Sequence, residues 1–321
     1  MFFPVSGIEI SPFFPPAIAF SISFFTSMSG VSGAFLLLPF QMSVLGYTAP
    51  SVSATNHLFN VVAIPGGLYR YIKEGRMVWP LALVVVAGTL PGAVAGALIR
   101  VKFLPDPQSF KLFAGAVLLY IGVRMVKDLT TNRSKEKKGT KAELQQLAEE
   151  AFIKQRQEAS RLDGNQPRGT NTLNIKKFSL TELRYEFCNT TFTVNIPAIL
   201  LMSAAVGLAG GVYGIGGGAI IAPFFVSMFR LPVYTVAGAA LLGTFVTSLA
   251  GVLFYQYLAM FYPDLSVSPD WLLGLLFGIG GMAGTYLGAK AQKHIPARPI
   301  KAILATSVMF IAVTYIAKAL H

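Results

Sequence analysis

A glycine-rich segment, residues 210–218, is the part of the sequence whose residue types point most directly to a binding site. It reads Gly-Gly-Val-Tyr-Gly-Ile-Gly-Gly-Gly, lies inside an apolar stretch and is followed by Pro223. Glycine and proline both oppose a continuous helix, so the helix should break here. A helix that restarts after the break presents free N–H groups and the positive end of its dipole, which suits an anion. We predict backbone contacts to an anion from Tyr213, Gly214, Gly216, Gly217 and Gly218.

A similar segment with fewer glycines, residues 29–34, lies in the first half of the chain and precedes Pro39. Gly30, Ser32 and Gly33 are the binding candidates in it. Ser32 and Ala34 stand where the later segment has glycine, so this half either binds more weakly or serves as structure. Neither segment is followed by Gly-Lys-Ser or Gly-Lys-Thr, which excludes a phosphate-binding P-loop.

Polar side chains that could complete a cavity gather in two other apolar stretches. Asn56 and Asn60 lie in one of them, and Thr244 and Thr247 lie in the other. Polar groups within membrane segments usually face the interior of the bundle or a water path. We therefore predict that these four side chains contact the same substrate.

His57 is the only histidine placed well inside an apolar stretch. Its charge changes near neutral pH, so it is a candidate for coupling proton movement to transport. The alternative is a neutral histidine with one hydrogen bond between helices. Leu241 occupies the matching position in the other half of the chain.

An intramembrane hydrolase that uses Ser32 and His57 is a further alternative. The glycines around Ser32 recur in the second half with Gly216 in place of the serine, and a shared structural break explains that better than a nucleophile does. The sequence has neither paired intramembrane aspartates nor a His-Glu-x-x-His motif. We predict no enzyme activity, no metal site and no cofactor.

The elements that must position these residues are membrane helices. Of the 321 residues 54% are hydrophobic and 12% are charged, whereas soluble proteins carry roughly a quarter charged residues. Eight apolar runs approach or exceed the about 20 residues that cross a bilayer. They are Phe13–Gly46, Ser51–Tyr69, Val78–Ile99, Phe110–Val126, Val194–Phe229, Val233–Phe261, Trp271–Ala291 and Lys301–Ala319. The first and fifth exceed one span, so we expect them to be broken or re-entrant. The fold class is an all-α integral membrane protein with seven to eight transmembrane helices.

The two apolar halves match each other. Pro39 and Pro223 lie 184 residues apart, and that offset holds without a gap across both glycine segments; Trp79 and Trp271, the only tryptophans, pair at an offset of 192. We predict a first repeat over 13–127, a polar insert over 128–192 and a second repeat over 193–319, with about four spans in each repeat. Parallel and inverted repeats both remain open. Glycines spaced by four should serve helix packing: Gly88, Gly92 and Gly96, and Gly280, Gly284 and Gly288.

The insert has its own local patterns. Thr140–Leu162 favours an amphipathic helix, and Phe178–Val194 favours a hairpin with Asn189 in its turn. A solvated linker and a partner-binding or regulatory element are both compatible with this composition. Lys and Arg within and beside the insert favour a cytoplasmic location. The net charge of +12 fits topogenic residues and anionic lipid headgroups, so we predict a lipid bilayer and no nucleic acid among the partners.

With the matched glycine and proline segments and the later Gly-x-x-x-Gly-x-x-x-Gly with Ala289 in view, both halves of the sequence resemble the TauE/SafE sulfite exporter family of membrane permeases. The resemblance implies a two-repeat, multi-pass transporter of the cell membrane. It implies export of a small anion, with sulfite, a sulfonate or another organic anion as substrate. A passive channel for small solutes is the alternative. A homo-oligomer and a cytoplasmic partner bound to the insert remain open.

Overall fold

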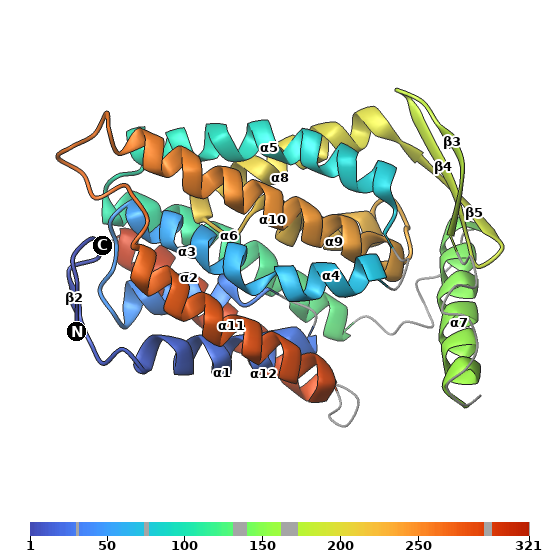
Figure 1. Cartoon of the computed structure of the whole chain (residues 1–321), viewed down its shortest axis with the longest axis horizontal. Coiled ribbons are helices and arrows are strands. Elements are labelled where there is room, and N and C mark those ends of the chain that lie inside the picture. Colours follow the sequence, from blue (N-terminus) through green and yellow to red (C-terminus); the bar gives the residue numbers. More distant parts are fainter. Residues whose placement is uncertain (30–31, 74–76, 131–139, 162–172, 292–296, 321) are drawn as a thin grey trace.

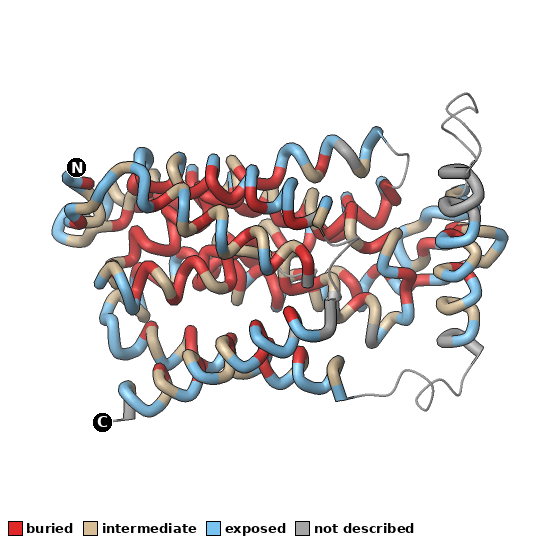
Figure 2. Tube along the Cα trace, turned by 90° about the horizontal axis from the view of Figure 1, so that it is seen from below, coloured by how far each residue is buried: buried red, intermediate tan, exposed pale blue. Residues whose placement is uncertain are grey.

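The computed structural model describes residues 1–29, 32–73, 77–130, 140–161, 173–291 and 297–320, and it is a helical bundle with a small sheet and one helix at one end (Figure 1). Among the described residues, six helices are long and apolar enough to cross a membrane, which confirms the predicted helical membrane fold. They are α5 (Trp79–Lys102), α6 (Pro107–Thr130), α8 (Ile196–Tyr213), α10 (Val233–Leu258), α11 (Trp271–Ala291) and α12 (Ala297–Leu320). Figure 2 shows that buried positions follow the inner faces of the bundle.

Both over-long apolar runs are broken, as predicted. The first forms α1 (Phe14–Ser29) and α2 (Ala34–Ser43), and the fifth forms α8 and α9 (Gly217–Ser227). Gly214 ends α8 in the left-handed conformation, with φ +83°, and its N–H donates to the Gly210 carbonyl over 2.8 Å. Gly216 has φ +72° and ψ 139°, a conformation that other residues rarely adopt. These two glycines reverse the chain direction.

The two broken runs are helical hairpins that enter the bundle from opposite ends (Figure 1). The second hairpin, α8–α9, has both of its ends at the insert: the Ile196 N–H donates to the Thr181 carbonyl, and Gln145 donates to the Leu231 carbonyl beyond α9. The first hairpin, α1–α2, begins and ends at the other end. There, the Ser266 hydroxyl bonds both Val5, which precedes α1, and Ser51, which follows α2.

The apolar run expected as one span over Ser51–Tyr69 is divided into α3 (Ser51–Ala63) and α4 (Pro65–Lys73). Pro65 has no N–H to donate, so it cannot continue the hydrogen-bond ladder of α3, and it is favoured at the first position of a new helix. The N–H of Ile64 closes α3 by donating to the Asn60 carbonyl over 3.0 Å.

The six glycines spaced by four lie at helix contacts, as predicted. Those on α5 pack against backbone carbonyls of α8, and those on α11 pack against backbone carbonyls of α1. A Cβ at any of the six would overlap atoms of the partner helix, so only glycine permits this approach. The facing carbonyls are those of Leu200, Ala204 and Leu208 on α8, and of Pro16, Phe20 and Phe24 on α1.

The insert contains α7 (Thr140–Arg161) and an antiparallel sheet of β3 (Leu173–Phe178), β4 (Glu182–Phe187) and β5 (Thr190–Asn195) in that order. The turn between β4 and β5 has Cys188 and Asn189 at φ +47° and +61°, the left-handed values that a two-residue hairpin turn requires. Strand β3 was not predicted, because the adjacent Lys176 and Lys177 interrupt its alternation. A second small ribbon pairs β1 (Phe2–Phe3) with β2 (Ile8–Glu9).

The insert is docked on the bundle, in contrast to the solvated linker that its composition allowed. The Phe152 ring of α7 lies 4.5 Å from the Tyr234 ring of α10 and 5.4 Å from the Phe187 ring of β4. The Tyr185 hydroxyl lies 3.0 Å from the Thr235 hydroxyl. Burial raises the pKa of Tyr185 well above its ordinary value, so its phenol stays neutral in this contact.

Phe152→Ala should detach the insert from α10, because it removes the ring that joins the two. Truncation of a buried phenylalanine costs about 3–5 kcal/mol. Limited proteolysis of the protein in lipid nanodiscs should show faster cleavage within the insert while the membrane fragment stays intact. Phe178→Ala, at a side chain that is 54% exposed, is the control. Equal cleavage rates for the two variants would show that the Phe152 contacts do not hold the insert.

Candidate functional site

The tips of the two hairpins meet inside the bundle. The hydroxyl of Tyr213, at the end of α8, donates to the carbonyl of Phe35 in the first turn of α2 over 3.0 Å. Tyr213 is fully buried. Two segments separated by 178 residues in the sequence are therefore joined at one point.

Helix α3 contacts both tips. The Ser53 hydroxyl donates to the Val212 carbonyl over 2.9 Å, and Gly214 packs directly on the Ser53 backbone. One turn later, the Asn56 side-chain amide donates to the Ala34 carbonyl over 3.1 Å. Asn56, one of the two polar residues predicted in this stretch, therefore lies beside the first glycine segment.

The second tip is seated on α10. The N–H of Gly217, the first residue of α9, donates to the Thr247 hydroxyl over 3.2 Å. Gly216 lies against Thr244 and Ser248, and Gly218 lies against Thr244. The fold thus brings both threonines predicted from the sequence to the glycine segment.

The glycines of the second tip are packed against protein in this conformation. A Cβ at Gly217 would lie 2.9 Å from Gly207 and from Thr89, so close packing accounts for the absence of a side chain there. Of the candidates in the first tip, Gly30 lies outside the described residues. Ser32 is partly buried and accepts from the Ala34 N–H at 3.4 Å, while Gly33 caps α2.

His57 is fully buried between α3 and α10. Its Nδ1 lies 3.3 Å from the Ser248 hydroxyl, its ring edge contacts Gly251, and its ring centre is 6.1 Å from that of Tyr255. Its Nε2 has no hydrogen-bond partner within the described part of the chain. The partner of His57 is therefore Ser248, and not the Ser32 that a hydrolase would require.

Other buried polar atoms of the first hairpin and of α3 also lack a partner among the described residues. They are the Ser23 hydroxyl, the Asn56 Oδ1, the Asn60 Nδ2 and both side-chain amide atoms of Gln41. Ser23 and Gln41 were not predicted. Serines are frequent in α1, and a hydroxyl inside a helix usually bonds its own backbone, so sequence alone did not distinguish Ser23.

Arg100 is a further residue that the sequence did not single out. It reads as one of several cations in a loop, but α5 extends through it and buries it completely. Its guanidinium donates to the carbonyls of Thr48, over 3.0 Å, and of Leu104, and it lies 3.7 Å above the Phe110 ring. It thus ties the α2–α3 loop to the α5–α6 loop.

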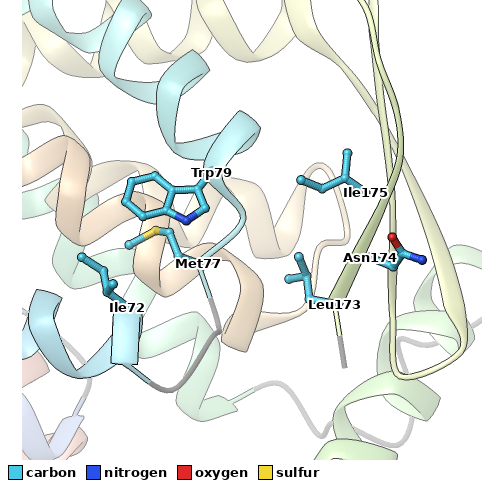
Figure 3. A pocket seen from close by; sticks show the side chains of 6 residues that line it. All are labelled: Ile72, Met77, Trp79, Leu173, Asn174 and Ile175. Carbon is cyan, nitrogen blue, oxygen red and sulfur yellow. The ribbon is translucent and has the colours of Figure 1, made fainter. Parts of the chain in front are cut away.

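A surface groove of about 400 Å³ lies away from the hairpin tips, between the α4–α5 connection and β3 (Figure 3). Five of the six residues that line it have apolar side chains, and the sixth carries an amide: Ile72, Met77, Trp79, Leu173, Asn174 and Ile175. Trp79 begins α5 and is 47% exposed, as is typical of tryptophan at a membrane surface. This lining does not suit a small anion.

Comparison with known proteins agrees with this architecture. The chain is similar to a probable membrane transporter protein of Xylella fastidiosa (strain 9a5c). The alignment is 25% identical over 285 residues and covers 85% of this chain and 84% of the relative. It is also similar to the probable membrane transporter protein YunE of Bacillus subtilis (strain 168). That alignment is 22% identical over 288 residues and covers 87% of each chain. No solved structure matches the chain significantly. The model of the sulfite exporter TauE/SafE family matches residues 16–315, so the chain belongs to that family of multi-pass membrane transporters.

Proposed function

We propose that the protein is a secondary transporter that exports a small anion, with sulfite, a sulfonate or another organic anion as substrate, bound between the two hairpins. The observation that carries this proposal is the contact of Tyr213 with Phe35, which joins the tips of two broken helices. Broken helices near the middle of the membrane hold substrates in many secondary transporters, and the N-terminal end of a half-helix favours an anion.

We also infer that the two halves are inverted repeats. The offset of 184 residues relates α1–α2 to α8–α9, and these hairpins enter from opposite ends. The close α5–α8 contact has its counterpart in the α11–α1 contact, since each is built on three glycines spaced by four. Inverted repeats allow a central site to open alternately to either side through related movements.

Flux into proteoliposomes tests the function. Sulfite, sulfoacetate, sulfate and lactate are supplied in turn, with and without an imposed pH gradient. A transporter should give saturable flux for a sulfur-containing anion and should exchange external for internal substrate. Flux that rises linearly with concentration would indicate a channel, and no flux for the four anions would remove the sulfur-anion assignment.

We propose His57 as the proton-coupling group, because it is buried at the junction of α3 and α10 and its Nε2 has no hydrogen-bond partner among the described residues. His57→Gln keeps an amide that can bond Ser248 but cannot titrate. The expected result is loss of the stimulation that the pH gradient gives, with flux falling to the level seen without a gradient. Flux of the same variant without a gradient is the internal control. Full stimulation in the variant would exclude His57 from coupling.

A further inference from the structure

Three buried side chains with an atom that lacks a partner among the described residues lie on the helices that pack against α2, namely Ser23 on α1 and Asn56 and Asn60 on α3. The Ser23 hydroxyl of α1 lies 2.7 Å from the position that a Cβ on Gly33 would occupy, next to the first residue of α2. Asn56 is bonded to Ala34, the first residue of that helix. Asn60 follows Asn56 by four residues, so both lie on one face of α3. Ser23, Asn56 and Asn60 are each at most 1% exposed.

Ser23 differs from the other described hydroxyls of α1. Those of Ser21, Thr26 and Ser27 each donate to a carbonyl three or four residues earlier, at 2.9–3.1 Å. The Ser23 hydroxyl has no such bond and points toward Gly33 instead. A buried hydroxyl without a partner destabilises the fold, and a bound ligand that forms a hydrogen bond with it would remove that cost.

The positions of the second half that match Ser23, Asn56 and Asn60 lack these unpartnered polar atoms in the described part of the chain. At the offset of 184 residues, Gly207, Ala240 and Thr244 stand in the places of Ser23, Asn56 and Asn60. The Thr244 hydroxyl is satisfied by its own helix, because it donates to the Ala240 carbonyl over 2.8 Å. Thr247 already accepts from the N–H of Gly217 at the start of α9. We call the group of Ser23, Asn56 and Asn60 the first half-site, and the matching positions 207, 240 and 244 the second. Of the two, the first has polar atoms available to bind a substrate.

The atom types at the first half-site define the ligand. The Ala34 carbonyl can only accept, so the atom of Asn56 that bonds it is the amide nitrogen, and the free atom is the acceptor Oδ1. Asn60 offers a free donor, and Ser23 can donate or accept. The ten-residue helix α2 adds the positive end of its dipole.

We infer that the transported anion binds on the first hairpin, to Ser23, Asn60 and the N-terminal end of α2, and that it is a singly charged oxyanion that also donates a hydrogen bond to Asn56. This inference rests on the proposed transport function. A fully deprotonated dianion would place an oxygen lone pair against the Asn56 Oδ1, whereas a hydroxyl or a protonated oxygen satisfies it.

Isothermal titration of the purified protein with two sulfonates of similar size tests the ligand class. Isethionate, 2-hydroxyethanesulfonate, has the donor, and ethanesulfonate lacks it. Isethionate should bind wild type roughly 3- to 10-fold more tightly, the effect of one hydrogen bond. Equal affinities would overturn the requirement for a donor.

Ser23→Ala tests the location. It should weaken isethionate binding by roughly 3- to 10-fold while the melting temperature of the unliganded protein stays equal or rises, since an unpartnered hydroxyl is removed. Ser203→Ala is the matched control, because Ser203 on α8 is equally buried, its hydroxyl also lacks a partner among the described residues, and its Cβ lies against Gly88 of α5. Asn60→Thr, which introduces the residue of the second half, should weaken binding as Ser23→Ala does.

The outcomes separate the two proposals. Wild-type affinity in both Ser23→Ala and Asn60→Thr would overturn the site on the first hairpin, and saturable flux in the same preparations would leave the transport function standing. Wild-type protein that neither binds these sulfonates nor moves any of the four anions in proteoliposomes would overturn both.

Discussion

Gly214→Ala should abolish transport and destabilise the protein strongly. Gly214 has φ +83°, where a residue with a side chain is strained by about 1–2 kcal/mol. Its new methyl group would also overlap the Ser53 backbone, which adds an overpacking cost of about 1–3 kcal/mol. Because α3 forms hydrogen bonds with both hairpins, a displacement of Ser53 should separate the two tips. The measurements are the melting temperature in detergent and anion flux in proteoliposomes.

Gly46→Ala is the matched control. Gly46 has φ +70°, yet nothing lies within 4 Å of the position of its Cβ. This variant therefore carries the backbone strain alone, and it should keep flux near the wild-type level with a smaller fall in melting temperature. Equal flux and equal melting temperatures for Gly214→Ala and Gly46→Ala would show that the close contact between Gly214 and the Ser53 backbone is not required.

Gly92→Ala should have the second large effect, on assembly of the bundle. A methyl group at Gly92 would overlap the backbone of Ala204 and Leu208, so α5 and α8 would have to move apart along their length. Backbone atoms cannot rotate away from the new methyl group as a side chain could. The loss of folding free energy should therefore reach or exceed the value for ordinary overpacking, about 1–3 kcal/mol. We expect little folded, monodisperse protein, measured by fluorescence-detected size-exclusion chromatography.

Gly284→Ala tests whether the two halves are equivalent. Gly284 approaches the Phe20 backbone on α1 as closely as Gly92 approaches the backbone of α8. The Gly284→Ala variant should therefore lose a similar share of folded protein. Gly66→Ala is the control, because Gly66 lies in α4 with nothing within 4 Å of its Cβ position. Normal yield of folded protein from Gly92→Ala would show that the α5–α8 contact tolerates an extra methyl group.

Much of the architecture could be predicted because it depends on local sequence. Apolar runs of sufficient length require helices in a bilayer, since each backbone polar group must be bonded within its own segment. Glycine at 214 and 216 permits left-handed backbone conformations wherever the rest of the chain lies. The helix at Thr140–Arg161 and the turn at Asn189 follow from the same local rules.

Local sequence also misled in two places. Ser51–Tyr69 contains no charged residue and reads as one span, although Pro65 interrupts its hydrogen bonding. Arg100 reads as a loop cation, because a charge near the end of an apolar run usually reaches water. The structure supplies it with two carbonyls and the Phe110 ring from segments that sequence spacing does not connect.

By itself, the sequence determined that this protein is a helical membrane protein with broken helices, that its glycines spaced by four are packing sites, and which polar residues lie within its apolar stretches. Only the tertiary structure decided that the two tips meet at Tyr213 and Phe35, that the insert docks on α10, and that the Ser23 hydroxyl has no partner among the described residues. The physical reason is that backbone conformation depends mainly on residues that are neighbours in the sequence, whereas the partner of a polar atom is set by segments brought together from far along the chain.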